Sequence, residues 1–152
     1  VCMATVEEIK SVLLLTHLSA EMLEKVAAIA TVSTIRAGQY IFKENDTADH
    51  LYSLLEGKVA LEIDQTSSTP VRVKDVVPNR TFGISALEDA AEKKSMSHAK
   101  ALTDCKVVSW EAAQLESLFD SDPKLGLVFM KRVAIIMKNR LKVAYAQLAQ
   151  HS

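Results

Sequence analysis

The sequence has little of several residue types that define specialised protein classes. Its 152 residues include two cysteines, three prolines and four glycines, and 5% of them are aromatic. So few cysteines exclude a small fold that depends on several disulfide bonds. Cys2 and Cys105 also lack the spacing of a metal-binding or redox motif. Unpaired cysteines fit a reducing compartment, so we expect a cytoplasmic protein.

Neither positive nor negative charge predominates in the sequence, and long apolar runs are absent. The formal net charge is −1, so no basic field draws the chain onto phosphate backbones, and we expect no nucleic-acid partner. No apolar run reaches the roughly 20 residues that cross a bilayer, so no membrane segment is expected. The histidines at positions 17, 50, 98 and 151 do not cluster in the sequence, which predicts no metal site.

Motifs of catalysis are absent as well. The chain has no nucleophile elbow, no HExxH and no phosphate-binding loop of the Walker type. Its paired carboxylates, Glu7-Glu8 and Glu88-Asp89, are adjacent in sequence, so on a helix they would diverge. The sequence therefore predicts a protein that is not an enzyme, with no catalytic residues and no cofactor.

Short strands and tight turns dominate the middle of the sequence. Residues 40–42 (Tyr-Ile-Phe) have strand-favouring side chains, and Glu56-Gly57 predicts a reversal because glycine reaches positive φ without strain. Residues 59–64 alternate between apolar and other side chains, which buries one face of a strand. The expected strands are 32–35, 40–42, 51–55, 59–63 and 71–76, with the last strands within 100–110 and a polar surface loop at 65–70.

Helical patterns flank these strands. Ser19 is a suitable N-cap for a first clear helix, and Asp122-Pro123 predicts the start of a long helix that runs to about Ala149. This last helix carries an apolar seam at steps of three and four residues, which is typical of a coiled coil. Val133, Ile136 and Val143 form a second apolar stripe beside the seam. We expect the seam to form a homodimer interface, although the seam and this second stripe could instead both cover the protein's own strands. The seam residues are Met130, Ala134, Met137, Leu141, Ala144 and Leu148.

The spacing of residues 38–59 resembles the cyclic-nucleotide-binding domain family, which includes catabolite-activator-like regulators. The resemblance rests on Gly38, Ile41-Phe42, Asn45-Asp46, Ala48, Leu51-Tyr52, Gly57 and Val59. Asn45 stands where the family usually has glycine, and asparagine is tolerated in a left-handed turn.

The resemblance implies an α+β fold, an antiparallel β-roll (double-stranded β-helix, jelly-roll-like) with N-terminal helices and a long C-terminal helix. One domain would span 1–152, with helices in 1–31, the β-roll in 32–110 and C-terminal helices in 111–149. No helix-turn-helix domain is expected.

The stretch from Phe82 to Cys105 resembles the family's phosphate-binding cassette, placed here at 82–95. The resemblance implies that an arginine binds the cyclic phosphate and a glutamate binds the ribose, and these two positions fall on Ser95 and Ile84. Lys93 or Lys94 could replace the arginine, or could belong to a solvated loop. The implied ligand-binding residues are Phe82, Gly83, Ile84, Ser85, Ala86, Lys94, Ser95, Met96 and Ser97.

Two functions follow from this cassette. The first is a non-catalytic regulatory or sensor module that binds a cyclic nucleotide weakly or binds an altered ligand. The alternative is a binding-incompetent copy of the fold that serves protein interaction or dimerisation. Apart from this ligand and a second copy of the chain, the sequence implies no partner.

Overall fold

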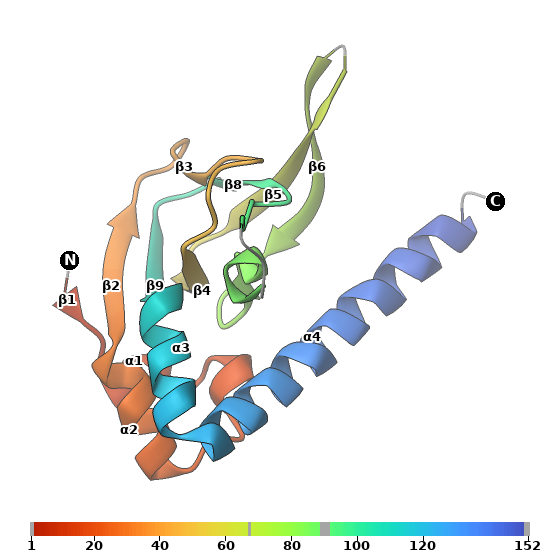
Figure 1. Cartoon of the computed structure of the whole chain (residues 1–152). Coiled ribbons are helices and arrows are strands. Elements are labelled where there is room, and N and C mark those ends of the chain that lie inside the picture. The colour runs from red at the N-terminus through yellow and green to blue at the C-terminus, as the bar shows by residue number, and fades with distance from the viewer. Residues whose placement is uncertain (1, 67, 89–91, 151–152) are drawn as a thin grey trace.

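Two antiparallel sheets form the centre of the computed structural model, which describes residues 2–66, 68–88 and 92–150 (Figure 1). The five-stranded sheet has the order β1-β2-β9-β4-β7, and the four-stranded sheet has the order β3-β8-β5-β6. The strands are β1 (Cys2–Met3), β2 (Ala30–Ile35), β3 (Tyr40–Phe42), β4 (His50–Glu56), β5 (Val59–Gln65), β6 (Ser68–Val76), β7 (Thr81–Phe82), β8 (His98–Ala101) and β9 (Cys105–Glu111).

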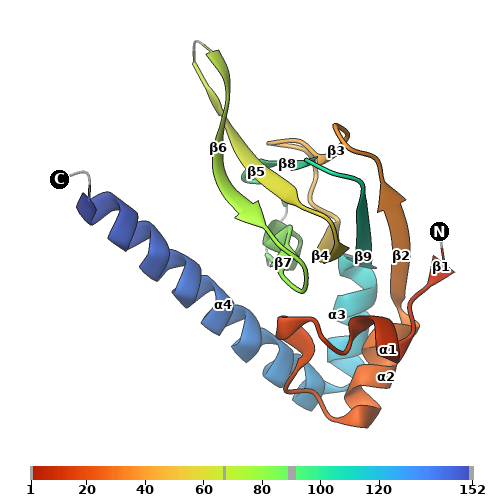
Figure 2. The same cartoon turned by 180° about the vertical axis from the view of Figure 1, so that it is seen from behind.

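Helices gather at one end of the sheets, and the long C-terminal helix extends away from them (Figure 2). The α-helices are α1 (Val6–Ile9), α2 (Ala20–Ala28), α3 (Ala112–Ser121) and α4 (Pro123–Gln150), and two short 3-10 helices are η1 (Leu13–Leu15) and η2 (Ile84–Leu87). The predicted cap of α2 is confirmed, because the amide of Met22 donates to Ser19 Oγ at 3.2 Å. The α+β class and the antiparallel roll are likewise confirmed.

The hairpin of β5 and β6 corrects the expected loop at 65–70. The two strands pair as far as Gln65 and Ser68, and the hairpin projects beyond the rest of the roll (Figure 1). Pro70 is tolerated because β6 is an edge strand and the register is irregular between Ile63 and Gln65. Backbone pairing does not require apolar side chains, so the polar composition of residues 65–70 wrongly predicted a loop.

Because this hairpin projects from the roll, its outer residues are less buried than the apolar alternation of residues 59–64 predicted. Val59 is fully buried, whereas Ile63 is 37% exposed and Val73, on the paired strand, is 46% exposed. The short strand β1 was not predicted at all, and it pairs through Cys2 and Met3 with Val32 and Thr31. A two-residue edge strand has no periodicity from which it could be recognised.

Helix α4 has two different halves. Leu125, Phe129 and Val133 are buried at four-residue spacing and attach the first half to the core. From residue 141 to residue 150 every side chain is exposed. In the described part of the chain, no helix is both long enough and apolar enough to cross a membrane.

The predicted cap of α4 is confirmed and supports a test by pH. The amide of Leu125 donates to Asp122 Oδ1 at 3.2 Å, and Lys25 Nζ lies 2.9 Å from Asp122 Oδ2. The hydrogen bond from Lys25, followed by that from Leu125, lowers the pKa of Asp122 below its usual value. A lowered folded-state pKa stabilises the fold above the unfolded-state pKa, and this contribution is lost as the pH falls through the folded-state value.

Asp122→Asn should therefore lower the melting temperature by a few degrees at pH 7. The deficit should shrink progressively below about pH 4, where the native carboxylate also becomes protonated. Calorimetric melting of both proteins between about pH 3 and pH 7 measures this, with the exposed Asp120→Asn as control. A deficit that is constant over this range would contradict the charge-based explanation.

Candidate functional site

Gly83 shapes the start of the cassette, directly after β7. Its φ is +78°, a left-handed conformation that favours glycine. A Cβ there would lie 3.1 Å from Tyr52 Cδ2 and 3.3 Å from the carbonyl oxygen of His50. The left-handed conformation favours glycine, and a Cβ would also crowd Tyr52 and the His50 carbonyl, so the chain turns tightly against the aromatic side chains of the roll.

Three aromatic side chains pack against one another next to this turn. Phe82 is fully buried and stacks on Tyr52, with ring centroids 5.3 Å apart and an interplanar angle of 15°. Phe42 lies against both, at 5.7 Å from Tyr52 and 6.1 Å from Phe82. Burial, with a smaller effect from the Asp49 carboxylate, raises the pKa of Tyr52 above its ordinary value. Tyr52 therefore stays neutral at pH 7 and offers a phenolic hydroxyl, not a charge.

A small hollow of about 190 Å³ lies beside Gly83 and Ser95. It is smaller than the roughly 300 Å³ at which ligand pockets usually begin. Its charged lining residues are acidic, Asp46 and Asp49, and no described lining residue is a lysine or an arginine. The full lining is Ile41, Phe42, Asp46, Thr47, Ala48, Asp49, His50, Tyr52, Gly83 and Ser95.

The backbone holds Ser95 firmly at the edge of this hollow. Its amide donates to the carbonyl of Asp46 at 2.9 Å, and its carbonyl accepts from the amide of Asn45 at 2.9 Å. Asn45 has a φ of +69°, so the asparagine does occupy a left-handed turn as predicted. The position implied for the phosphate-binding cation is thus held by two backbone hydrogen bonds, and it carries a buried hydroxyl.

Ile84 has a structural reason to be apolar. It is partly buried in η2 and packs against the core cluster that contains the helices and Trp110. Ser85 and Ala86, the next residues of η2, are buried. The position implied for the ribose-binding acid is therefore occupied by a side chain that packs against the core.

The two lysines that could replace the missing arginine make other interactions. Lys93 Nζ donates to the carbonyl of Ala86 at 3.0 Å and to Glu116 Oε1 at 3.2 Å, so it links the cassette to α3. Lys94 is exposed, and its Nζ lies 3.8 Å from Glu92 Oε2. Neither lysine is among the residues that line the hollow.

The remaining predicted ligand-binding residues differ in solvent exposure. Ser97 is buried, whereas Met96 is 71% exposed. Of all the predicted ligand-binding residues, Gly83 and Ser95 line the hollow. Ligand contact stays a prediction for all of these residues.

A cluster of one histidine and two carboxylates, which the sequence did not predict, lies at the four-stranded sheet. Ligand-type atoms of Glu44, Asp64 and His98 lie within 4.8 Å of one another. His98 Nδ1 accepts from the amide of Glu44 at 3.0 Å, and His98 Nε2 lies 2.7 Å from Asp64 Oδ1. Both ring nitrogens are therefore occupied by the protein itself, and this arrangement explains the cluster without a metal ion.

Comparison with known proteins adds to this geometry. Residues 32–122 match the family model of the cyclic nucleotide-binding domain. The chain is 33% identical to a solved structure described as a cyclic nucleotide-binding protein, from Geobacter metallireducens. The match covers 91% of this chain and 99% of that chain, with a TM-score of 0.78.

Two curated relatives are longer proteins. The global nitrogen regulator of Nostoc sp. is 26% identical over 100 residues, which are 66% of this chain and 45% of the regulator. Glutaminase 1 of Bradyrhizobium diazoefficiens is 28% identical over 137 residues, which are 89% of this chain and 21% of that protein. The chain thus spans less than half the length of either relative.

Proposed function

The chain belongs to the cyclic nucleotide-binding domain family, and on this premise we propose that it is a non-catalytic regulatory module with weak or altered nucleotide binding. The observation that supports weak binding is the charge around the cassette. Apolar Ile84 and uncharged Ser95 stand at the two positions that would hold the ribose and the phosphate, and the adjoining hollow is lined by Asp46 and Asp49.

The expected loss of affinity follows from these groups. Each missing charged hydrogen-bond partner costs roughly 1.5–3 kcal/mol. Two such losses weaken binding by about a hundredfold to ten-thousandfold. Carboxylates close to a cyclic phosphate would repel it further, because like charges a few ångströms apart disfavour each other near a protein surface.

Isothermal titration of the chain with cyclic AMP and with cyclic GMP tests this proposal. We expect dissociation constants near or above about 1 mM, or no measurable heat. Binding of either nucleotide at or below about 10 μM would contradict it. A thermal-shift series at millimolar nucleotide provides a second readout that does not depend on the enthalpy of binding.

The alternative, a module for association between copies of the chain, is favoured by the exposed seam of α4. Leu127, Leu141 and Leu148 are 57%, 51% and 69% exposed, which leaves an apolar stripe open to solvent. Met137 differs from the rest of the predicted seam, because it packs partly against the chain's own core. The interface proposed here therefore consists mainly of Met130, Ala134, Leu141, Ala144 and Leu148.

Leu141→Glu should convert such a dimer into a monomer, because it would place a carboxylate in the middle of the apolar seam. Sedimentation at about 10 μM measures the mass of both proteins, a concentration at which a dimer with micromolar affinity is mostly formed. Lys142→Glu changes the charge at the next, exposed position and should leave the dimer intact. A native chain that sediments as a monomer, or a dimer that Leu141→Glu does not affect, would remove this proposal.

A further inference from the structure

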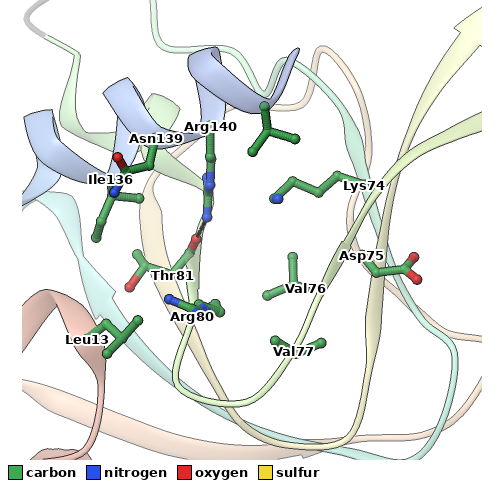
Figure 3. A pocket seen from close by; sticks show the side chains of 11 residues that line it. Leu13, Lys74, Asp75, Val76, Val77, Arg80, Thr81, Ile136, Asn139 and Arg140 are labelled. Atoms are coloured by element: carbon green, nitrogen blue, oxygen red, sulfur yellow. Dashed lines mark hydrogen bonds between the residues drawn. The ribbon is translucent and has the colours of Figure 1, made fainter. Parts of the chain in front are cut away.

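A second cavity, of about 310 Å³, lies between α4 and the connection from β6 to β7 (Figure 3). Its volume is at the lower end of the range of small-molecule sites. Its walls combine aliphatic side chains with several cations. The lining is Leu13, Lys74, Asp75, Val76, Val77, Arg80, Thr81, Ile136, Asn139, Arg140 and Val143.

Three cations from separate segments line this cavity. Arg140 reaches from α4 toward Thr81 and Arg80, and the side chain of Lys74 extends from β6 toward the same space (Figure 3). Among the described residues, no ion pair is recorded for any of the three. No carboxylate in the described ranges therefore neutralises their charges.

The acid in the lining, Asp75, is already neutralised elsewhere. Arg72 donates to both of its carboxylate oxygens, and Lys58 Nζ lies 3.7 Å away. Its side chain points away from the cavity (Figure 3). These contacts lower the pKa of Asp75, with the hydrogen bond from Arg72 as the main cause, so it stays charged and paired. The cavity keeps an excess of positive charge.

Arg140 has donors to spare. It donates from Nη2 to the carbonyl of Thr81, and this is the one acceptor recorded for it within the described residues. A guanidinium has five N–H donors, so most of them remain available. Burial, and then the like charge of Arg80, lower the pKa of Arg140, which still stays protonated at neutral pH. Two neighbouring cations in a partly buried cavity are unfavourable unless an anion joins them.

We propose that this cavity binds a small multivalent oxyanion, a phosphate or carboxylate group of a metabolite, between Arg80 and Arg140. The planar guanidinium groups match the paired oxygens of both chemical classes. Lys74 adds a third charge, and Val77 and Val143 offer an apolar wall to the rest of the ligand. The site uses no cassette residue, so it goes beyond the proposed nucleotide binding and does not depend on it. A bound anion would also bridge α4 to the roll.

Titration with inorganic pyrophosphate and, separately, with citrate tests the site at constant ionic strength. We expect saturable binding of at least one probe, and the tighter of the two indicates whether phosphate or carboxylate chemistry is preferred. Arg140→Gln and Arg80→Gln should each weaken this binding by roughly ten- to a hundredfold. Lys142→Gln removes one charge from the exposed face of α4, and it should change the affinity for the probe by less than about twofold.

Several outcomes would overturn the proposal. They are no saturable binding of either probe, an equal loss in Lys142→Gln, or binding that survives both arginine substitutions. Melting curves without ligand confirm that each variant folds, and the exposed Arg80 provides the test if Arg140→Gln does not fold. A chain that binds pyrophosphate but gives neither heat nor a thermal shift with millimolar cyclic AMP and cyclic GMP keeps this site and favours the alternative function, association between copies of the chain. A chain that binds cyclic AMP but neither pyrophosphate nor citrate keeps nucleotide binding and refutes this site.

Discussion

Cyclic AMP is expected to bind the double variant Ile84→Glu, Ser95→Arg about a hundredfold to ten-thousandfold more tightly than the native chain. The substitutions restore an acceptor for the ribose hydroxyl and a cation for the cyclic phosphate. Ser95 is held by two backbone hydrogen bonds at the edge of the hollow, so a side chain placed there begins from a defined position. The turn at Gly83 is already formed.

Calorimetric titration of the double variant and of a neutral control, Ile84→Gln, Ser95→Gln, separates charge from shape. The control should stay within about tenfold of the native affinity, because neutral hydrogen bonds contribute less than charged ones. Ile84 packs against the core, so Glu at this position will lower stability, and melting curves must accompany each titration. If the double variant does not fold, Ser95→Arg alone should still gain about tenfold. A folded double variant with native affinity would refute our interpretation of the cassette.

Trp110→Ala should lower the free energy of unfolding by about 3–5 kcal/mol. Trp110 is fully buried on β9, in the cluster that also contains residues of α2 and α4. Its Nε1 donates to the carbonyl of Val26 at 3.0 Å, which links the sheet to the C-terminal end of α2. Because domains of this size are stable by only about 5–15 kcal/mol, this one substitution would remove much of the margin.

Urea denaturation followed by far-ultraviolet circular dichroism measures this loss, since the chain has a single tryptophan and the variants lose its fluorescence. Trp110→Phe is the matched control, because it keeps an aromatic ring but leaves the Val26 carbonyl without its donor. It should cost less than Trp110→Ala, about 1–3 kcal/mol. A loss below about 1 kcal/mol for Trp110→Ala would show that this contact is not central to the core.

Local signals in the sequence were sufficient for most of the elements. Gly57 has a φ of +100° at the predicted reversal, and Ser19 and Asp122 cap the helices that they were expected to cap. These features depend on the conformational preferences of a few neighbouring residues, which is why they can be recognised without the fold. The hairpin beyond residue 63 was missed because its strands pair through the backbone without the apolar alternation from which a strand is recognised.

The candidate site was predictable only in outline. The resemblance predicted the turn at Gly83, and it implies that uncharged Ile84 and Ser95 stand where the family has charged ligands. It did not show that Lys93 bonds to Ala86 and Glu116, or that Asp46 and Asp49 line the hollow. Lys93 and Glu116 are 23 residues apart, and Asp46 and Asp49 come from a different segment than Gly83, so no local pattern reports these contacts.

By itself, therefore, the sequence determined the β-roll and the capped helices, and it predicts a cassette without the family's usual charges. Only the tertiary structure decided which charges face one another. Arg140 interrupts the apolar stripe of Val133, Ile136 and Val143, a signal that could have marked it, but its neighbours Lys74 and Arg80 come from another part of the chain. Periodicity assigns a side chain to a face of its own helix or strand, whereas packing between elements determines what lies opposite that face.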